Sequence, residues 1–507
     1  MMHRGGTDED GDDQKVLPPH WANSHSAEDT YSSIYLVDNN TYIIDPMKTP
    51  EEKRLVKKFD RRILPLMCII TFIQFADKMA INYAVPLGLR EDTGLSDSEF
   101  STLAALFYVG FLCYQIPNNY CLQYIPLGIY ISTLLIAWGT VLAFTSMCTN
   151  FEQLAALRLL LGIGEGGVYP CLALLVSTFY RRSEQTLRLG TFWLCNGFAI
   201  AFSGFIHYGI AHIPAMGNVH GWMWCMIILG CTTVSVGIVC LFTIIDDPRS
   251  LRWHHNAEEQ ELVEERAKDN AVVRTARVKY QHMWEAAREV RFWLFCMSSL
   301  FVNLLNGAMT NYSVSITESF GFHGLHSIVL QVPSGFTDIV CVLFAAWLSQ
   351  RTRQTLLTAC GCLTLTAISL LLVQFAPGRI VKLIGLYLCW SYAAAYVLIL
   401  ASISNNVCGY TKKIFYNGSM MIFYTAGNII GPFLMLPVAN GLIVYIAATA
   451  ASTLFLFLAR RDMANINRHR SRRNDAEDMG QGGATVLVET PEGDLTDKQD
   501  PHFVYRL

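Results

Sequence analysis

Charged residues are scarce in this sequence. Asp, Glu, Lys and Arg make up 16% of its 507 residues, and hydrophobic residues make up 52%. An ordinary soluble protein has about 25% charged residues, and here the deficit is concentrated in long apolar blocks. The composition therefore favours a membrane protein. The net charge of −3 gives no indication of a nucleic-acid partner, and we expect none.

Several chemical signatures are also missing. The fifteen cysteines form no pair with metal-ligand spacing and lie mostly in the apolar blocks, so we interpret them as small apolar fillers and expect no metal site. We find no nucleophile–base pair and no phosphate-binding loop, so we expect neither an enzyme nor a cofactor. The opening residues, "MMHRGGTDEDGDD", are not followed by an apolar run, which excludes a signal peptide.

Long apolar stretches recur along the chain. A bilayer core about 30 Å thick needs about 20 mostly apolar residues as a helix, and twelve stretches qualify. They are roughly 63–85, 100–121, 127–147, 153–178, 187–210, 222–245, 292–316, 327–349, 354–375, 380–403, 414–436 and 438–459. The charged segment 246–291 separates the sixth stretch from the seventh. The sequence therefore predicts an all-α membrane protein with six spans, a linker and six further spans.

Basic residues indicate the orientation. If both ends are cytoplasmic, the inside regions hold 29 Lys and Arg residues and the outside loops hold two, Arg90 and Arg379. This asymmetry obeys the positive-inside rule, and we expect a multi-pass protein of the plasma membrane. The tails, 1–62 and 460–507, are then cytoplasmic. Their polar parts are predicted to be disordered, and the linker is predicted to form a helix on the cytoplasmic face.

Few ionisable side chains lie within the predicted spans, where each costs a few kcal/mol unless it faces a cavity or a partner. Asp77 and Lys78 are adjacent, so they point about 100° apart around a helix. We expect one to line a cavity and the other to face a neighbouring helix. The remaining ionisable residues in the spans, apart from Arg188 and Lys382 near span ends, are Arg158, Glu165, His207 and Asp338. His207 is near an outer end, and we interpret it as an ordinary interfacial histidine.

The fourth span, "LAALRLLLGIGEGGVYPCLALL", is the most informative. Arg158 and Glu165 are seven residues apart and share one helix face, about 10 Å from each other. Gly162 and Gly166 recur every fourth residue near that face, which lets a helix or a substrate approach closely. Pro170 is expected to kink the helix. The alternative is an Arg–Glu pair that only joins helices.

These residues suggest a division of roles. Cations attract an anionic ligand, so Lys78 and Arg158 are the predicted substrate-binding charges. Desolvation raises the pKa of a buried carboxylate and nearby cations lower it, so such a group can carry a proton at physiological pH. Glu165 is the preferred proton-coupling residue, followed by Asp77 and then Asp338, which has no obvious local partner in span eight.

Amides in the second half are a further source of polarity. Asn406 ends span ten, and Asn428 lies in span eleven beside a glycine and shortly before Gly431-Pro432. Both are predicted to contact a polar ligand. For each, bonding to a neighbouring helix is the alternative interpretation.

Four stretches together resemble the major facilitator superfamily, and more narrowly the fungal allantoate permease group of the anion:cation symporters. They are "ADKMAINYA", "RLLLGIGEGGVYP", "DDPRSLRW" and "SNNVCGYTKK…FYTAGNIIGP". The resemblance covers about residues 50–465. It implies two six-helix bundles, 63–245 and 292–459, around a central cavity that opens alternately to the two sides. It also implies proton-coupled uptake of a small carboxylate-bearing solute, with Asp77, Lys78, Arg158 and Glu165 carrying binding and coupling.

Among the departures of the sequence from the pattern of that family, two lie in the first six spans. The base in span one is commonly arginine, and here it is Lys78, which offers a point charge and not a two-pronged match to a carboxylate. The connection between spans two and three usually carries a Gly-Asp-Arg signature, whereas "NYCLQYIPLGIY" has no charge.

The predicted function is therefore secondary active uptake of a small organic anion, such as a carboxylate, ureide or vitamin-like solute, together with a proton. The expected partners are this anion, the proton and the lipid bilayer, and we expect a monomer. A proton-driven exporter is an alternative, although span five lacks the proline of the exporter signature. A non-transporting nutrient sensor is another, although the tails are short for signalling.

Overall fold

The structure is a computed structural model. It describes residues 34–36, 42–44, 49–213, 219–253, 256–271, 279–435, 438–480, 496–499 and 503–507. The chain divides into two units, Met1–Lys57 and Lys58–Leu507. In the first unit, β1 (Ile34–Leu36) and β2 (Tyr42–Ile44) pair antiparallel. This short hairpin lies within the N-terminal region that the sequence predicts to be disordered, whose remaining residues fall largely outside the described ones.

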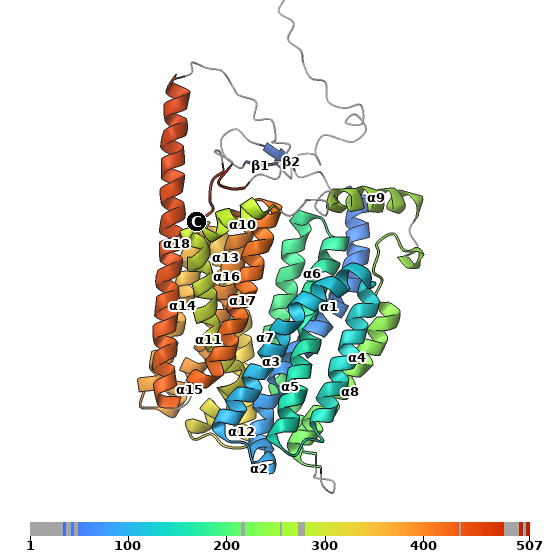
Figure 1. Ribbon diagram of the computed structural model, residues 1–507, viewed down its shortest axis with the longest axis vertical. Coiled ribbons are helices and arrows are strands. Elements are labelled where there is room, and N and C mark those ends of the chain that lie inside the picture. The colour runs from blue at the N-terminus through green and yellow to red at the C-terminus, as the bar shows by residue number, and fades with distance from the viewer. Residues whose placement is uncertain are drawn as a thin grey trace, which may run out of the picture. The chain divides into compact units, whose positions relative to one another are not determined.

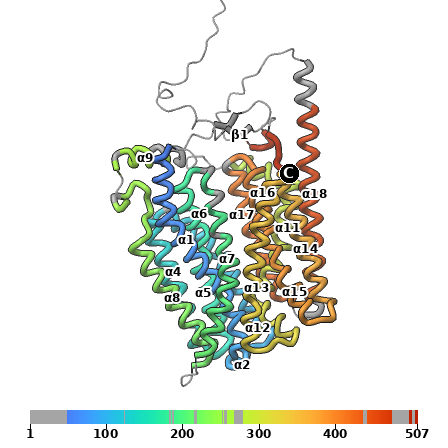
Figure 2. Tube along the Cα trace, turned by 180° about the vertical axis from the view of Figure 1, so that it is seen from behind, coloured from blue at the N-terminus to red at the C-terminus, as the bar shows by residue number. Residues whose placement is uncertain are grey.

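The second unit contains two groups of helices, seen side by side in Figures 1 and 2. The first bundle consists of α1 (Pro50–Ala84), which begins in the first unit, η2 (Val85–Leu87), α2 (Leu89–Thr93), α3 (Asp97–Tyr124), α4 (Leu127–Thr145), α5 (Phe151–Gly166), α6 (Val168–Phe179), α7 (Arg182–Ile210) and α8 (Gly221–Thr243). The second bundle consists of α11 (Val290–Ser319), α12 (Leu325–Val329), α13 (Val332–Thr352), α14 (Thr355–Phe375), α15 (Arg379–Cys389), α16 (Ser391–Asn406), α17 (Tyr410–Leu434) and α18 (Val438–Gly480).

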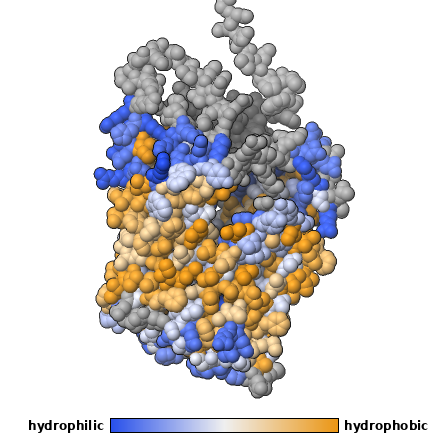
Figure 3. All heavy atoms as spheres, viewed as in Figure 1, coloured by the Kyte–Doolittle hydropathy of each residue, from blue (hydrophilic) through white to orange (hydrophobic). Residues whose placement is uncertain are grey.

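Helices form at all twelve predicted positions, and the fold class is as predicted. Within the described residues, eleven helical segments are long and apolar enough to cross a membrane. The eleventh predicted span, α17, is not among them, because polar residues and glycines such as Asn417, Asn428 and Gly431 recur along its length. It packs against α11 and α3. Figure 3 shows an apolar band between hydrophilic ends on the visible face.

The linker forms η3 (Leu251–Trp253), α9 (Ala257–Ala271) and α10 (Tyr280–Ala287). We call the end of the bundles that carries α9 and α10 the linker face, and the end that carries α2 and α12 the opposite face (Figure 1). Lys58 forms a 2.8 Å salt bridge with Glu259 of α9, and Lys412 of α17 forms one with Glu285 of α10. Each linker helix is therefore attached to a different bundle, and the predicted linker helix is confirmed as two helices.

Glycines set the spacing of the central helices. A Cβ atom on Gly162 of α5 would lie 1.9 Å from the main-chain oxygen of Phe107 in α3, and one on Gly431 of α17 would lie 2.2 Å from that of Leu304 in α11. Between the bundles, a Cβ on Gly335 of α13 would lie 2.2 Å from the nitrogen of Ala201 in α7. Any larger residue at these positions forces the backbones apart. The predicted close approach at Gly162 is confirmed.

The fourth span is broken where the sequence predicts a kink. Helix α5 ends at Gly166 and α6 begins at Val168. Pro170 has no N–H, so it cannot donate to the carbonyl of Gly166 four residues earlier. Gln115 of α3 donates to that carbonyl instead, at 3.0 Å. The tenth span is similarly divided between α15 and α16 at Trp390.

A carboxylate that is distant in the sequence caps α4, the helix after the uncharged connection that follows α3. Pro126 precedes α4 and has no side-chain acceptor for the free N–H groups of the first turn. The N–H of Gly128 donates to Asp246, which follows α8. An acceptor from the "DDPRSLRW" stretch thus caps the helix that follows the uncharged connection.

We expect Asp246→Ala to lower the free energy of unfolding by about 1 kcal/mol, the usual loss when a helix-capping side chain is removed. Asp246→Asn retains a side-chain oxygen that accepts the Gly128 N–H and should lose less. Thermal unfolding of the two purified variants beside the unmodified protein checks this, and equal midpoints for Ala and Asn contradict it.

Candidate substrate site

A cavity lies between the two bundles near their centre. The empty space between its walls is about 610 Å³, which includes space open to solvent. The first bundle contributes residues of α1, α6 and α7, and the second bundle contributes residues of α11, α13, α16 and α17 together with Trp390. The lining residues are Phe75, Lys78, Tyr169, Trp193, Asn196, Ile200, Asn303, Asn306, Asp338, Val342, Trp390, Tyr392, Ala393, Tyr396, Val397 and Tyr424.

Lys78 is the cation of this cavity. Its ammonium lies 4.7 Å from the ring centre of Tyr108 and 5.6 Å from that of Phe75. It also donates to the hydroxyl of Tyr424 at 3.5 Å, across the boundary between the bundles. Aromatic faces stabilise a cation through their negative quadrupole. Lys78 is thus held in place by three rings, and only 7% of it is exposed.

No carboxylate of the described residues forms a salt bridge with Lys78, although it is buried. A desolvated ammonium without a counter-ion costs several kcal/mol. An anion that enters the cavity would supply the missing negative charge. The site is therefore suited to a ligand that carries a carboxylate or another anionic group.

Asp77 points away from this cavity, as its position beside Lys78 predicts. Its Oδ2 accepts hydrogen bonds from Trp138 of α4 and Thr233 of α8, both at 2.8 Å. Its Oδ1 is buried without a hydrogen-bond partner in the described part of the chain. The different directions of Asp77 and Lys78 are thus confirmed, and Asp77 lies inside the first bundle.

Arg158 and Glu165 are buried on α5 and do not line the cavity. Gln74 of α1 donates to Glu165 Oε2 at 2.8 Å, while Oε1 has no partner among the described residues. The Arg158 Nε and Nη2 atoms are likewise without partners there. Glu165 interacts electrostatically with Asp77, Lys78 and Arg158. The structure therefore brings the four predicted charges into one cluster, but only Lys78 reaches the cavity wall.

Asp338 of α13 is the carboxylate that lines the cavity. It is buried, and its Oδ1 has no hydrogen-bond partner within the described residues. A Cβ on Gly197 of α7 would lie 2.8 Å from Asp338 Oδ2, so this glycine makes room for the carboxylate between the bundles. Of the three predicted proton-coupling residues, Asp338 is the one placed both at the cavity and at the boundary between the bundles.

The two predicted amides have different positions. Asn428 does not line the cavity, but its Oδ1 accepts a 2.7 Å hydrogen bond from Asn306, which does. The hydroxyl of Tyr392 donates to Oδ1 of Asn306 at 2.9 Å. Asn406 lies at the linker-face end of α16, where it bonds the main chain of Arg506. Its predicted role in substrate binding stays a prediction, and the structure does not bring it to the cavity.

Sequence reasoning missed the aromatic residues of the cavity. Tyr169 and Trp193 are stacked with ring centres 5.6 Å apart and an interplanar angle of 13°. Tyr396 and Tyr424 pair across the cavity from them at 5.7 Å. Aromatic residues are common in membrane helices, so their presence alone does not indicate a cavity. The one sequence feature that could have pointed to Tyr169 is the glycine-rich helix break at Gly167, two residues before it.

The cavity is closed toward the opposite face by contacts between the bundles. Asn82 of α1 donates to Ser313 of α11 at 2.8 Å and accepts from the N–H of Val314. The hydroxyls of Ser101 in α3 and Tyr312 in α11 are 2.6 Å apart. These hydrogen bonds hold the opposite-face ends of α1 and α3 against α11.

His207 differs from its expected environment. The sequence places it at an interface near the end of a span, but the structure buries it completely. Its ring stacks on Tyr83 at 4.4 Å, and Nδ1 lies 2.7 Å from the carbonyl oxygen of Ser203.

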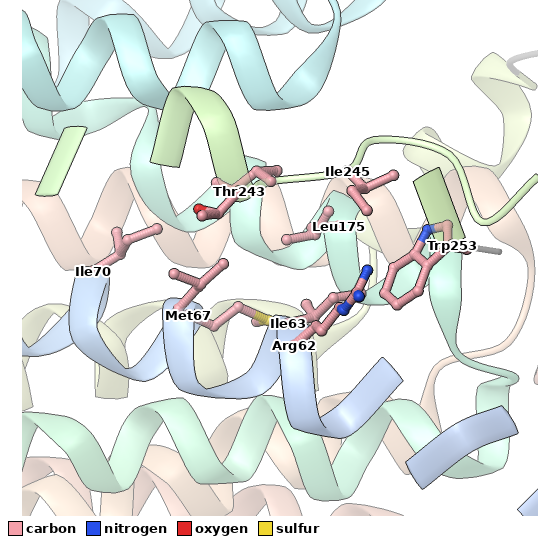
Figure 4. Close-up of a pocket in the computed structure, with 10 residues that line it drawn as sticks. Arg62, Ile63, Met67, Ile70, Leu175, Thr243, Ile245 and Trp253 are labelled. Atoms are coloured by element: carbon pink, nitrogen blue, oxygen red, sulfur yellow. The ribbon is translucent and has the colours of Figure 1, made fainter. Parts of the chain in front are cut away.

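A second pocket lies near the linker face of the first bundle and is mostly apolar. Figure 4 shows Ile63, Met67 and Ile70 of α1 facing Leu175 and Trp253. Its one charged residue, Arg62, lies 5.4 Å from the ring centre of Trp253. Because it contains no buried ionisable group, it is a weaker candidate than the central cavity.

Two bundles of apolar helices around a cavity with buried charge are the architecture of a multi-pass membrane transporter. The sequence pattern of the Major Facilitator Superfamily matches residues 67–432, and the chain belongs to this superfamily. An uncharacterised transporter of Schizosaccharomyces pombe is 30% identical over 93% of this chain and 92% of its own length. The allantoate permease of Saccharomyces cerevisiae is 26% identical over 90% and 87%.

Solved structures agree on the fold. A bacterial homologue of the human lysosomal transporter Spinster has a TM-score of 0.61 and 15% identity, covering 80% of this chain and 97% of its own. The xylose transporter XylE of E. coli has a TM-score of 0.59 at the same identity, covering 79% and 99%. Members of this superfamily carry small molecules across membranes.

We expect Asn428→Ala to raise the KM for transport about five-fold, because it removes a hydrogen bond that orients Asn306, and such a bond contributes about 1 kcal/mol. Asn406→Ala is the matched control, since that amide lies away from the cavity. Uptake measured against substrate concentration checks both variants. If KM rises in Asn406→Ala and not in Asn428→Ala, then Asn406, and not Asn428, contributes to substrate binding.

Proposed function

We propose that this protein takes up a small organic anion together with a proton, by alternating access. The observation that carries the proposal is the buried ammonium of Lys78 in the central cavity, with no salt bridge to a carboxylate in the described residues. An anion bound beside this ammonium, at the boundary between the two bundles, would offset the cost of its desolvation. Binding there contacts both bundles at once, which is what a substrate must do to bias their relative movement.

The walls of the cavity favour a compact solute with a flat part. Tyr169 and Trp193 on one side and Tyr396 and Tyr424 on the other offer ring faces for stacking. Asn196, Asn303 and Asn306 offer amide donors and acceptors for a polar group. The likeness to the allantoate permease of Saccharomyces cerevisiae supports a small organic anion as the solute.

Proton coupling is proposed for the buried carboxylates. Glu165 interacts with the cations Lys78 and Arg158. Protonation of Glu165 removes its negative charge, so these cations then attract the substrate anion more strongly. Asp338 is the second candidate, because it lines the cavity at the contact between α7 and α13. We place the protein in the plasma membrane with the linker face in the cytoplasm, supported by the basic residues of that face.

The direct test is uptake of radiolabelled ureides, vitamins and carboxylates by cells or proteoliposomes, with and without an imposed proton gradient. Accumulation of one anion that depends on the gradient supports the proposal. Accumulation of a neutral or cationic solute, or transport only outward, contradicts it.

Lys78→Ala should reduce kcat/KM at least about 30-fold, since truncating one partner of a buried charge pair costs about 2–5 kcal/mol. Lys78→Arg should retain measurable transport, because a guanidinium keeps the charge and stacks on Tyr108. Initial uptake rates at equal surface expression provide the comparison. Normal transport by the alanine variant would show that the charge only joins the bundles.

Arg158→Gln tests the second predicted substrate charge. We expect loss of substrate binding in a folded protein, because Arg158 adds to the positive field that the anion experiences even though it does not line the cavity. Binding measured by the substrate's effect on thermal unfolding is independent of transport. If Arg158→Gln binds the substrate as tightly as the unmodified protein does, Arg158 does not contribute to anion binding and Lys78 is the only one of the two cations that does.

Glu165→Gln mimics the protonated carboxyl group and should bind substrate but lose accumulation driven by a pH gradient. Counterflow exchange, which needs no net proton movement, should survive. Asp338→Asn is the matched comparison in the second bundle. If Glu165→Gln still concentrates substrate and Asp338→Asn does not, coupling belongs to Asp338, and Asp77→Asn is then the remaining test in α1.

A further inference from the structure

Two stretches near the end of the sequence lie against the linker face of the second bundle. We call residues 496–499 and 503–507 the clasp segment. Asn406 of α16 donates to the carbonyl of Arg506 at 2.8 Å and accepts from its N–H at 2.7 Å. Asn467 of α18 holds Tyr505 in the same way, at 2.8 and 2.9 Å. Each amide therefore bonds the main chain as a neighbouring strand would.

Further main-chain contacts extend this attachment. The carbonyl of Leu507 accepts from the N–H of Thr355, the first residue of α14, at 2.7 Å. Arg470 of α18 donates to the carbonyls of Phe503 and Asp497. The prediction that this tail is disordered is therefore wrong for the clasp segment, while residues 481–495 and 500–502 lie outside the described part.

A buried carboxylate anchors the other end of the clasp segment. Asp497 is completely buried and forms salt bridges with Lys412 of α17, at 2.9 Å, and with Arg291 of α11. It also accepts from the hydroxyl of Tyr505 at 2.6 Å and from the N–H of Cys408. One aspartate thus bonds the ends of two spans and the turn between α16 and α17.

The ring of Tyr505 completes the contact. The guanidinium of Arg291 lies 4.5 Å from its centre and that of Arg470 lies 5.3 Å away. Arg291 also bonds Glu289 at 2.8 Å, outside the clasp segment. Lys412 likewise bonds Glu285 and Glu289. Arg291 and Lys412 therefore have carboxylate partners besides Asp497, whereas the contacts of Arg470 named above are all with the clasp segment.

We propose that the linker face of the second bundle is a binding site for a short peptide with an acidic residue followed by an aromatic one, and that the clasp segment of this chain fills it. The bound segment fastens together the linker-face ends of α11, α14, α16, α17 and α18. Lys412, Arg291 and the amides of Asn406 and Asn467 are its specificity determinants.

The helices to which the clasp segment binds include two that line the central cavity. Helix α16 carries Tyr392 and Tyr396, and α17 carries Tyr424. Fastening the linker-face ends of α16 and α17 restrains any movement of these helices that would open the cavity toward the linker face. The clasp segment therefore slows substrate exchange on that side, an effect that rests on the proposed function, whereas the binding site itself does not.

The interaction is expected to persist across physiological pH. Burial acts to raise the pKa of Asp497, but Arg291 and Lys412 act to lower it, and the net pKa lies below the usual 3.8. A carboxylate with a lowered pKa contributes its full stabilisation above the usual value and loses it as the pH falls further. Mild acidification does not release the clasp segment.

Hydrogen exchange of the full-length protein tests the binding site. In Asp497→Asn, exchange at the amides of Thr355, Cys408 and Arg506 should rise at least about ten-fold, the equivalent of about 1.4 kcal/mol. Lys498→Gln, which removes the exposed charge of the next residue, should leave these amides protected. Unchanged exchange in Asp497→Asn, or an equal rise in Lys498→Gln, overturns the proposal.

A second variant guards against misfolding. Tyr505→Phe removes only the hydroxyl that bonds Asp497 and should raise exchange at the same three amides by a smaller factor. Protection of the amides near Asn82 and Ser313, at the opposite face, reports whether each variant is folded. A rise at Thr355, Cys408 and Arg506 only together with these distant amides indicates general unfolding and counts against a local site.

The effect on transport is measured separately in proteoliposomes. Counterflow by Asp497→Asn should be at least about twice as fast as that of the unmodified protein, with unchanged KM, because loss of contacts at the linker face lowers the cost of opening there. Equal counterflow despite increased hydrogen exchange overturns the restraint on transport. If the protein carries no organic anion at all, the hydrogen-exchange result still decides the binding site.

Discussion

The ammonium of Lys78 is the charge around which the centre of this protein is organised. It is buried between two bundles, and no salt bridge to a described carboxylate offsets its desolvation. Three aromatic side chains hold it, and one of them, Tyr424, belongs to the other bundle. Such a charge is tolerated in a membrane protein where it faces a cavity and not lipid. The aromatic side chains around Lys78 are explained by this one charge, and the proposed substrate anion would supply its missing counter-ion.

Close helix packing makes that arrangement possible. Gly162 and Gly431 bring α5 against α3 and α17 against α11. Gly335 brings α13 against α7 at the boundary between the bundles. Tight contact through glycine allows the two bundles to touch without interlocking large side chains, which suits surfaces that must move relative to each other. Asp338 sits at this contact, where movement of the bundles changes its surroundings.

The two faces of the protein are held by different interactions. Toward the opposite face, short hydrogen bonds of Asn82 and Ser101 join one bundle to the other. Toward the linker face, the ion pairs of Lys412 and Arg291 act within the second bundle and bind the clasp segment. In the proposed alternating access, contacts between bundles must break, whereas contacts within one bundle can persist. The charged network of the linker face does not join the second bundle to the first, but it restrains movement of helices within the second bundle.

The sequence by itself determined the twelve helical positions, because a membrane demands long apolar stretches whose backbone bonds are satisfied internally. It also determined that Asp77 and Lys78 diverge and that Gly162 is a contact point, because both follow from the geometry of a single helix. Only the tertiary structure decided which charges reach the cavity, that Asn406 bonds Arg506 and not the cavity, and that the clasp segment is ordered. These outcomes depend on side chains far apart in the chain, such as Lys78 and Tyr424, which are 346 residues apart. Helical periodicity says which way a side chain leaves its own helix, but the residue it meets is set by how separate helices pack.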